Sequence, residues 1–363
     1  MKQNKFFKFS VIALSIVLIA CSGGTEAGCP ETDGRSLNVV VTTPMMGEFV
    51  SQVAGDNVNL TILMPPEADP HTYEPAPQDA GLIADADLVF YTGLKYEPAA
   101  VVKLLENSAC SQEILAEIGE NVFPIEFKEG GHDDHHDDHG DEEGHDDEEG
   151  HDDEEGHDDE EGHDDEEGHD DEEGHDDEEG GHEGHDHGAF DPHFWFDPGR
   201  VIYAVEYIES KLSEFDPDNQ SSYEALSSDY KSELSGLTGQ VSGLISTVPS
   251  QNRKLITTHE SLGYLEAKFG LEVLSTIIPD LDSSNEISPS QLVDVIDVIE
   301  DNNVKVIFIE SEAPSVYAET IVAETGIKAV EGLWVETLRE GQSYPDFLIS
   351  AVELIVENLS NTD

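Results

Sequence analysis

The chain has 363 residues, 82 of them acidic and 16 basic, and its formal net charge is −66. Residues 131–188 contain 33 of the acidic side chains and none of the basic ones, so the rest of the chain still carries −33. This excess of negative charge argues against nucleic acid as a partner, because phosphates are bound through Lys and Arg. It favours cations near the surface, although adaptation to a salty habitat explains it equally well.

The N-terminus has the pattern of an export signal. Three lysines precede an apolar stretch at residues 11–19 that is too short to span a bilayer. Leu-Ile-Ala then precedes Cys21, a pattern that resembles a bacterial lipobox, in which the cysteine is lipidated and becomes the new N-terminus. An ordinary secretory signal is the alternative. We expect a lipoprotein signal peptide at residues 1–20, lipidation of Cys21, and a flexible tether at 21–36.

Outside the acidic stretch, the sequence predicts alternating strands and helices. The expected strands are residues 37–43, 58–64, 87–92, 254–258, 272–277, 304–309 and 327–330, and the expected helices are 46–54, 77–84, 198–212, 218–246, 261–269, 289–302, 313–325 and 344–359. Apolar residues three or four apart form one stripe along the helix at 218–246. The predicted fold class is α/β, with an N-terminal lobe at 37–217, a long linking helix at 218–246 and a C-terminal lobe at 247–363.

Only two cysteines follow Cys21. In an oxidising compartment Cys29 and Cys110 are able to form one disulfide that joins the tether to the first lobe. Two free thiols are the alternative, and the sequence does not decide between them.

Most of the sixteen histidines lie in a tandem HDDEEG repeat within residues 131–188. Such a tract cannot bury a core, so we expect disorder and weak, rapidly exchanging zinc sites. A spacer that only keeps the chain soluble is the alternative. The thirteen histidines of the tract are His132, His135, His136, His139, His145, His151, His157, His163, His169, His175, His182, His185 and His187.

Three histidines stand apart from the tract. His71 follows a strand of the first lobe, His193 precedes the helix at 198–212, and His259 directly follows the first strand of the second lobe. Each one taken alone is more often a structural residue. Ligand sites in open α/β sheets collect at the carboxyl ends of strands, so the three together indicate a metal site.

The segments around these histidines resemble the zinc and manganese substrate-binding proteins of bacterial ABC importers. The resemblance covers about residues 37–359, and it is carried by DPHTYEP at 69–75 with the following Asp79, ADLVFYTGL at 86–94, DPHFWFDP at 191–198, HESLGY at 259–264 and FIE at 308–310. Zinc-specific members carry a His/Asp/Glu-rich loop at the position of this tract. The resemblance implies two α/β lobes joined by a rigid helix, with the metal bound in the cleft between them.

Carried over residue by residue, the resemblance implies His71, His193 and His259 as metal ligands. The fourth family ligand is often an aspartate after a strand near the C-terminus; here Glu331 is the candidate and Glu336 the second choice. Three imidazoles suit Zn²⁺, whereas manganese prefers more oxygen. Glu310, Glu74 and Glu260 are candidates for orienting the ligating histidines. For these three, solvated glutamates in an acidic protein are the alternative.

The expected function is high-affinity capture of zinc outside the cytoplasm by a monomeric lipoprotein and its delivery to an ABC permease, with no enzymatic activity. Manganese or another divalent metal is the alternative cargo, and a metal-buffering or adhesive surface lipoprotein is the alternative function. A zinc hydrolase is disfavoured because a carboxylate would close the fourth coordination position, and HExxH and other catalytic motifs are absent from the sequence.

Overall fold

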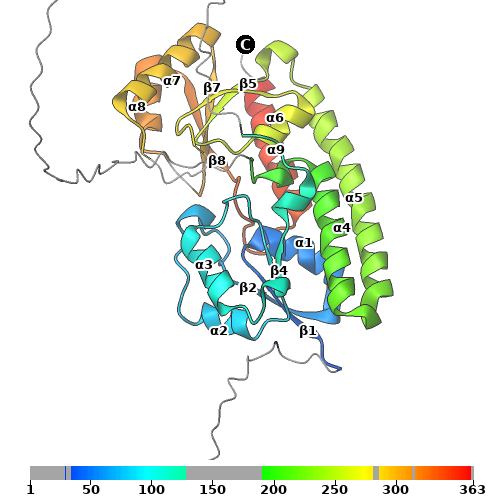
Figure 1. The fold of residues 1–363 in the computed structure, drawn as a ribbon. Coiled ribbons are helices and arrows are strands. Elements are labelled where there is room, and N and C mark those ends of the chain that lie inside the picture. Colours follow the sequence, from blue (N-terminus) through cyan, green and yellow to red (C-terminus); the bar gives the residue numbers. More distant parts are fainter. Residues whose placement is uncertain (1–28, 30–33, 128–189, 281–285, 313–314, 361–363) are drawn as a thin grey trace, which may run out of the picture.

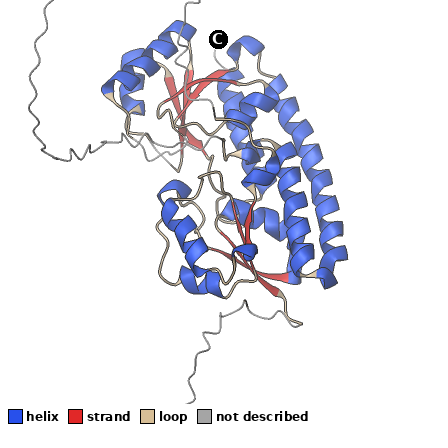
Figure 2. Cartoon of the chain, viewed as in Figure 1, coloured by secondary structure: helices blue, strands red, loops and turns tan. Residues whose placement is uncertain are grey.

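The computed structural model describes Cys29 and residues 34–127, 190–280, 286–312 and 315–360. The predicted signal peptide, Cys21 and the histidine tract lie outside these ranges. The described chain forms two lobes, each a sheet with helices packed on it, one above the other in Figure 1. The secondary structure in Figure 2 shows the red strands of each lobe enclosed by blue helices. This is the predicted α/β class.

The first lobe is built on a parallel sheet with the strand order β2-β1-β3-β4. Its elements are β1 (Leu37–Val41), α1 (Pro44–Ala54), β2 (Val58–Ile62), α2 (Asp79–Ala84), β3 (Leu88–Tyr91), α3 (Ala99–Ser108) and β4 (Leu115–Glu117). Neither α3 nor β4 is among the elements predicted from the sequence. Short 3₁₀ turns complete the chain: η1 (Gly55–Asn57), η2 (Pro70–Thr72), η3 (Gln112–Ile114), η4 (Gly119–Val122), η5 (Phe194–Phe196), η6 (Pro217–Asn219) and η7 (Ser250–Asn252).

The second lobe repeats this topology in the order β6-β5-β7-β8, again with parallel strands. Its elements are β5 (Lys254–Thr257), α6 (Gly263–Phe269), β6 (Glu272–Thr276), α7 (Pro289–Asn302), β7 (Val306–Glu310), α8 (Ala318–Thr325), β8 (Lys328–Leu333) and α9 (Tyr344–Ser360). In both lobes the first strand of the lobe lies in the middle of the sheet. The loops that follow neighbouring strands therefore meet at one edge, where ligands of such sheets collect.

Two antiparallel helices run along one side of both lobes, α4 (Pro198–Phe215) and α5 (Gln220–Ser246). The Asp197 side chain caps the start of α4 by accepting the N–H of Gly199, and Pro198 occupies the first turn, as the sequence predicted. With 27 residues, α5 is the predicted long linking helix. It contacts α1 of the first lobe and α9 of the second, so it ties the two lobes together.

The core has three parts because both faces of each parallel sheet are covered. Side chains alternate across the sheet: Val39 and Val41 of β1 join a cluster that extends under α4 and α5 into the second lobe, whereas Val40 faces a separate cluster beneath α2 and α3. The continuous cluster spans both lobes. It therefore fixes the position of the first sheet relative to the second, including the carboxyl ends of their strands.

Cys29 and Cys110 form a disulfide. The two half-cystines pack beside the cluster beneath α2 and α3, and Cys110 lies between α3 and β4. The bond joins the start of the described chain to the first lobe across 81 residues of sequence. The sequence had left this pairing open.

Candidate metal centre

Four side chains from the facing edges of the two lobes converge at one point. His71, His193, His259 and Glu336 each offer one ligand atom, and these atoms all lie within 4.8 Å of one another. Two of the histidines come from the first half of the fold, and His259 and Glu336 come from the second lobe. The three histidines predicted from separate sequence motifs are therefore brought together.

Local backbone structure places each of the four residues. His71 lies in η2. The side chain of Asp69 caps the start of this turn by accepting the N–H of His71. His193 stands directly before η5. His259 follows the end of β5, and Glu336 follows the end of β8. Each thus stands in a loop or turn at or near the sheet edges, held by regular structure on at least one side.

One carboxylate oxygen lies close to all three imidazoles. Glu336 Oε1 is 2.8 Å from His259 Nε2, 3.2 Å from His193 Nε2 and 3.6 Å from His71 Nε2. The edge of a tetrahedron built from zinc bonds of 2.0–2.1 Å is about 3.4 Å. The three distances to Glu336 scatter around that value, and all four donor atoms lie within 4.8 Å of one another, so the set would have to contract around a single tetrahedral ion of this size.

The group is largely buried, with His71 the most exposed of the four, and it is incompletely hydrogen-bonded. His193, His259 and Glu336 are 0% exposed. Among the described residues, His71 Nε2, His259 Nε2 and Glu336 Oε2 have no hydrogen-bond partner. The His259 Nε2 and Glu336 Oε1 atoms are close but are not aligned as a hydrogen bond. Unsatisfied polar atoms in such a buried position are costly, and a cation bound between them would satisfy all of them together.

Two further carboxylates, those of Asp191 and Glu310, fix the orientation of the His193 and His259 rings. Asp191 Oδ1 accepts the backbone N–H of His193 and lies 2.8 Å from its Nδ1. Glu310 contacts Nδ1 of His259 and accepts its backbone N–H, and Ser261 Oγ donates to Glu310 at 3.1 Å. When Nδ1 carries the proton in such a pair, the lone pair of Nε2 faces the centre, the usual arrangement of a metal-bound histidine.

The charges in the group shift one another's pKa values strongly. For His193, burial disfavours the charged ring, but the charge of Glu336 and the bond to Asp191 outweigh it and raise the pKa to about 9. His259 shows the same balance against Glu310 and Glu336, and its pKa lies well above the ordinary value. Burial alone would raise the pKa of Glu336, but the histidines hold it well below its usual range. In the metal-free protein, the protonated rings of His193 and His259 therefore supply the positive charge beside Glu336.

The fourth member of the group is Glu336, the second choice from the sequence, and the structure does not bring Glu331, the first choice, to the histidines. The predicted strand ended at residue 330, but β8 continues to Leu333, with a register shift where it pairs with Glu310. Glu331 therefore lies within the strand, exposed, beside a pocket lined also by Ile309 and Val316. The loop beyond the sheet edge begins later and carries Glu336.

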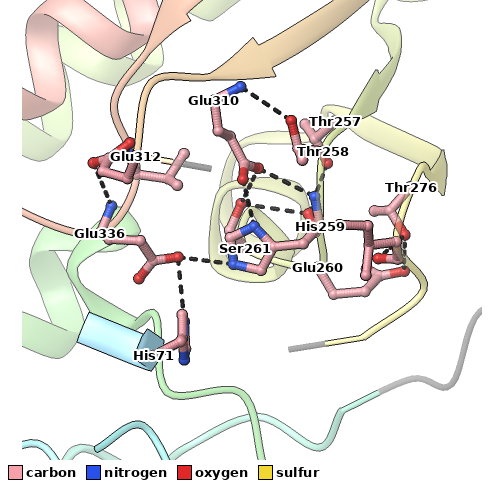
Figure 3. A network of polar contacts seen from close by, with 12 residues as sticks. His71, Thr257, Thr258, His259, Glu260, Ser261, Thr276, Glu310, Glu312 and Glu336 are labelled. Carbon is pink, nitrogen blue, oxygen red and sulfur yellow. Dashed lines mark hydrogen bonds and ion pairs between the residues drawn. The ribbon is translucent and has the colours of Figure 1, made fainter. Parts of the chain in front are cut away.

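Of the glutamates predicted to orient the histidines, only Glu310 contacts one. Glu74 is exposed beside η2. The side chain of Glu260 turns away from the centre and accepts a hydrogen bond from Thr276 Oγ1, and burial raises its pKa to about 7 (Figure 3).

Sequence reasoning missed Asp191, although a signal was present. Both Asp69 and Asp191 stand two residues before a histidine in a repeated Asp-Pro-His motif, and each accepts the backbone N–H of that histidine. It also missed Tyr96, whose buried ring packs against His71 and His193.

The chain matches the family described as zinc-uptake complex component A, periplasmic, over residues 39–358. It belongs to this family. Membership of a periplasmic family places the protein on the extracytoplasmic side, as its N-terminal signal predicted. Within the described ranges, none of the helices has the length and apolar character needed to cross a membrane.

Relatives named for different metals match nearly the whole chain. The manganese-binding lipoprotein MntA of Halalkalibacterium halodurans is 22% identical over 356 residues, covering 97% of this chain and 98% of that protein. The high-affinity zinc uptake system protein ZnuA of Bacillus subtilis is 28% identical over 361 residues, covering 97% and 96%. The solved structure of the periplasmic zinc binding protein TroA from Treponema pallidum shares the fold, with a TM-score of 0.68, 20% identity, and coverage of 90% of this chain and 100% of that one.

Proposed function

We propose that this protein captures a divalent metal ion outside the cytoplasm and delivers it to the permease of an ABC importer, and that the ion is zinc. The observation that carries the proposal is the buried group of three imidazoles and one carboxylate, contributed from both sides of the inter-lobe junction. His71, His193, His259 and Glu336 are the proposed ligands. Relatives that match nearly the whole chain are named as a manganese-binding lipoprotein, a zinc uptake system protein and a metal ABC transporter substrate-binding lipoprotein.

The donor set supports zinc over manganese. Three of the four candidate donors are imidazole nitrogens, which suit Zn²⁺, whereas Mn²⁺ prefers carboxylate, carbonyl and water oxygens. Manganese stays the alternative cargo because relatives of both kinds match the chain. A competition titration separates the two: zinc should displace bound Mn²⁺ at equimolar concentration. If excess zinc failed to displace Mn²⁺, the cargo assignment would be reversed.

The same donor set supports a carrier rather than an enzyme. Catalytic zinc sites keep one position open for water, whereas four protein donors around one ion leave none.

We further propose that Cys21 carries a lipid anchor, as the names of the lipoprotein relatives suggest, and that the protein acts as a monomer beside its permease. The histidine tract would then supply weak zinc sites near the centre.

The decisive experiment is zinc titration by calorimetry on the chain lacking residues 1–21. Three forms are compared: the intact chain, a deletion of residues 131–188, and that deletion with His259→Ala. We expect one tight site to survive the deletion while the weak sites disappear, and we expect His259→Ala to remove the tight site. If the deletion removed all tight binding, the protein would be a metal-buffering lipoprotein whose tract holds the ions.

A further inference from the structure

The loop that carries Glu336 is held through its backbone rather than through its side chains. Beyond β8, the N–H groups of Val335, Glu336 and Thr337 all point to the carboxylate of Glu312. They reach the same oxygen, Oε1, at 3.1, 3.0 and 3.3 Å. Figure 3 shows Glu312 on one side of Glu336 and His71 and His259 on the other.

Three consecutive N–H groups that point to one place form a concave anion site. Here the carboxylate of Glu312, from the loop after β7, fills it. Burial and the nearby charge of Glu336 raise the pKa of Glu312 to about 8. Its Oε1 accepts hydrogen bonds in either protonation state, and loss of this acceptor would leave three N–H groups in a partly buried position without it. The conformation of residues 335–337 therefore depends on Glu312.

The carbonyl groups of the same loop are held from the first half of the fold. Tyr96 Oη donates to the carbonyl oxygen of Glu336 at 3.0 Å, and Trp195 Nε1 donates to that of Val335 at 2.8 Å. Both rings are buried and pack against His193. The loop is thus fixed on two opposite sides, by Glu312 within its own lobe and by two aromatic residues across the junction.

We propose that Glu312 is a positioning residue for the metal centre: its carboxylate holds the backbone of residues 335–337 in the one conformation that places the carboxylate of Glu336 among the three histidines. The inference rests on the proposed function, since it assigns the metal to that centre. Glu312 itself does not belong to the group of candidate ligands. On this proposal its effect on binding acts through Glu336.

A thermodynamic cycle on the chain lacking residues 1–21 tests the role of Glu312. Zinc affinity is measured in competition with a tight chelator, so that weak sites do not contribute. Glu312→Ala and Glu312→Met both remove the acceptor, and the methionine retains most of the side-chain volume. We expect each to weaken zinc binding by about 10- to 100-fold, the range seen when a residue supporting a ligand is lost. Glu312→Gln keeps an Oε1 acceptor and should restore most of the affinity.

The second arm repeats Glu312→Met in a Glu336→Ala background. If Glu312 acts by placing Glu336, its loss should cost nothing further there, because coupled residues are non-additive. Asp87→Asn is the control: this buried carboxylate also accepts a backbone N–H, from Asn38, and pairs with Arg35. It precedes β3 of the first-lobe sheet, at the end of the strands away from the metal centre.

The outcomes separate the inference from the proposed function. Equal losses of affinity in both backgrounds would mean that Glu312 only stabilises the fold, and unchanged affinity in Glu312→Met would mean that it does not position the loop; either result overturns the inference. If the unmodified chain itself lacks a single tight site, the proposed function fails first. A cobalt-loaded sample gives a second readout, because loss of the Glu336 ligand should change the visible absorption of Glu312→Met in the same way as that of Glu336→Ala.

Discussion

One oxygen of Asp191 holds both the backbone and the ring of His193. Asp191 Oδ1 accepts the N–H of His193 and lies 2.8 Å from its Nδ1, and Nε2 of the same ring lies 3.2 Å from Glu336. In the second lobe Glu310 also holds the backbone and the ring of His259, but with one oxygen for each. Each lobe therefore supplies one histidine whose ring direction is set by a carboxylate before any ion arrives.

Replacement of Asp191 tests this relationship. Asp191→Asn keeps the size of the side chain but removes the charge that favours an Nδ1 proton and makes Nε2 a better donor to metal. We expect zinc affinity to fall by about tenfold or more, in the range known for residues that orient metal-bound histidines. Isothermal titration measures the change. Glu260→Gln, a carboxylate of the same region that turns to Thr276, should leave affinity unchanged; equal effects of the two variants would argue against the orienting role.

Glu336 and Glu331 form a natural pair for testing the fourth ligand. They have the same chemistry and stand five positions apart, but only Glu336 lies among the histidines. We expect Glu336→Ala to weaken zinc binding by at least about 100-fold, because a buried charged donor is lost from a site of four. Glu331→Ala should bind zinc as the unmodified protein does. A loss on Glu331→Ala with none on Glu336→Ala would restore the original candidate.

The fold and three of the four converging residues were predictable because their signals are local. Pro289–Asn302 begins with a capping box at Ser288 and Gln291, and its predicted bounds were correct. The three histidines each stand at a break in a regular pattern of apolar residues. These features depend on neighbours in sequence, which a single sequence displays.

The fourth residue was not predictable in the same way because it depends on where a strand ends in space. β8 continues through Gly332 to Leu333 because β7 beside it offers further pairing, with a register shift opposite Glu310. Nothing in residues 328–333 shows that pairing. Glu312 escaped notice for a similar reason: its partners are backbone N–H groups more than twenty positions later.

The disulfide should support the fold without tuning the centre. Cys29–Cys110 closes a loop of 81 residues, and the chain-entropy model gives about 4.5 kcal/mol for a loop of this length. We expect the double variant Cys29→Ser, Cys110→Ser to lose free energy of unfolding on this scale in urea. Its zinc affinity should stay unchanged, since both cysteines pack beside the cluster under α2 and α3, on the far face of the first sheet from α4 and α5. A parallel loss of affinity would show that the two regions are coupled.

Metal binding should depend on pH well above the ordinary histidine range. Zinc binds the neutral imidazole, but the pKa of His193 in the metal-free protein is raised to about 9, against burial, by Glu336 and Asp191. At pH 7 the ion must therefore displace at least one proton, and apparent affinity should rise by about tenfold per pH unit for each proton up to pH 9. Calorimetry in two buffers of different ionisation enthalpy counts these protons. An affinity that does not change between pH 6.5 and 8.5 would contradict the prediction.

The same protons should act in the opposite direction on folding of the metal-free protein. The folded-state pKa of His193 lies above the unfolded value of about 6.5, so its contribution is fully present below pH 6.5 and is lost as pH rises to about 9. The shift corresponds to stability on the order of 3 kcal/mol. Urea unfolding at pH 6 and pH 9 should therefore show a less stable metal-free protein at the higher pH, and His193→Gln should reduce that difference. With zinc bound the dependence should reverse, because the ion replaces the protons; a metal-free protein that gains stability from pH 6 to 9 would mean that the histidines are not held in their charged form.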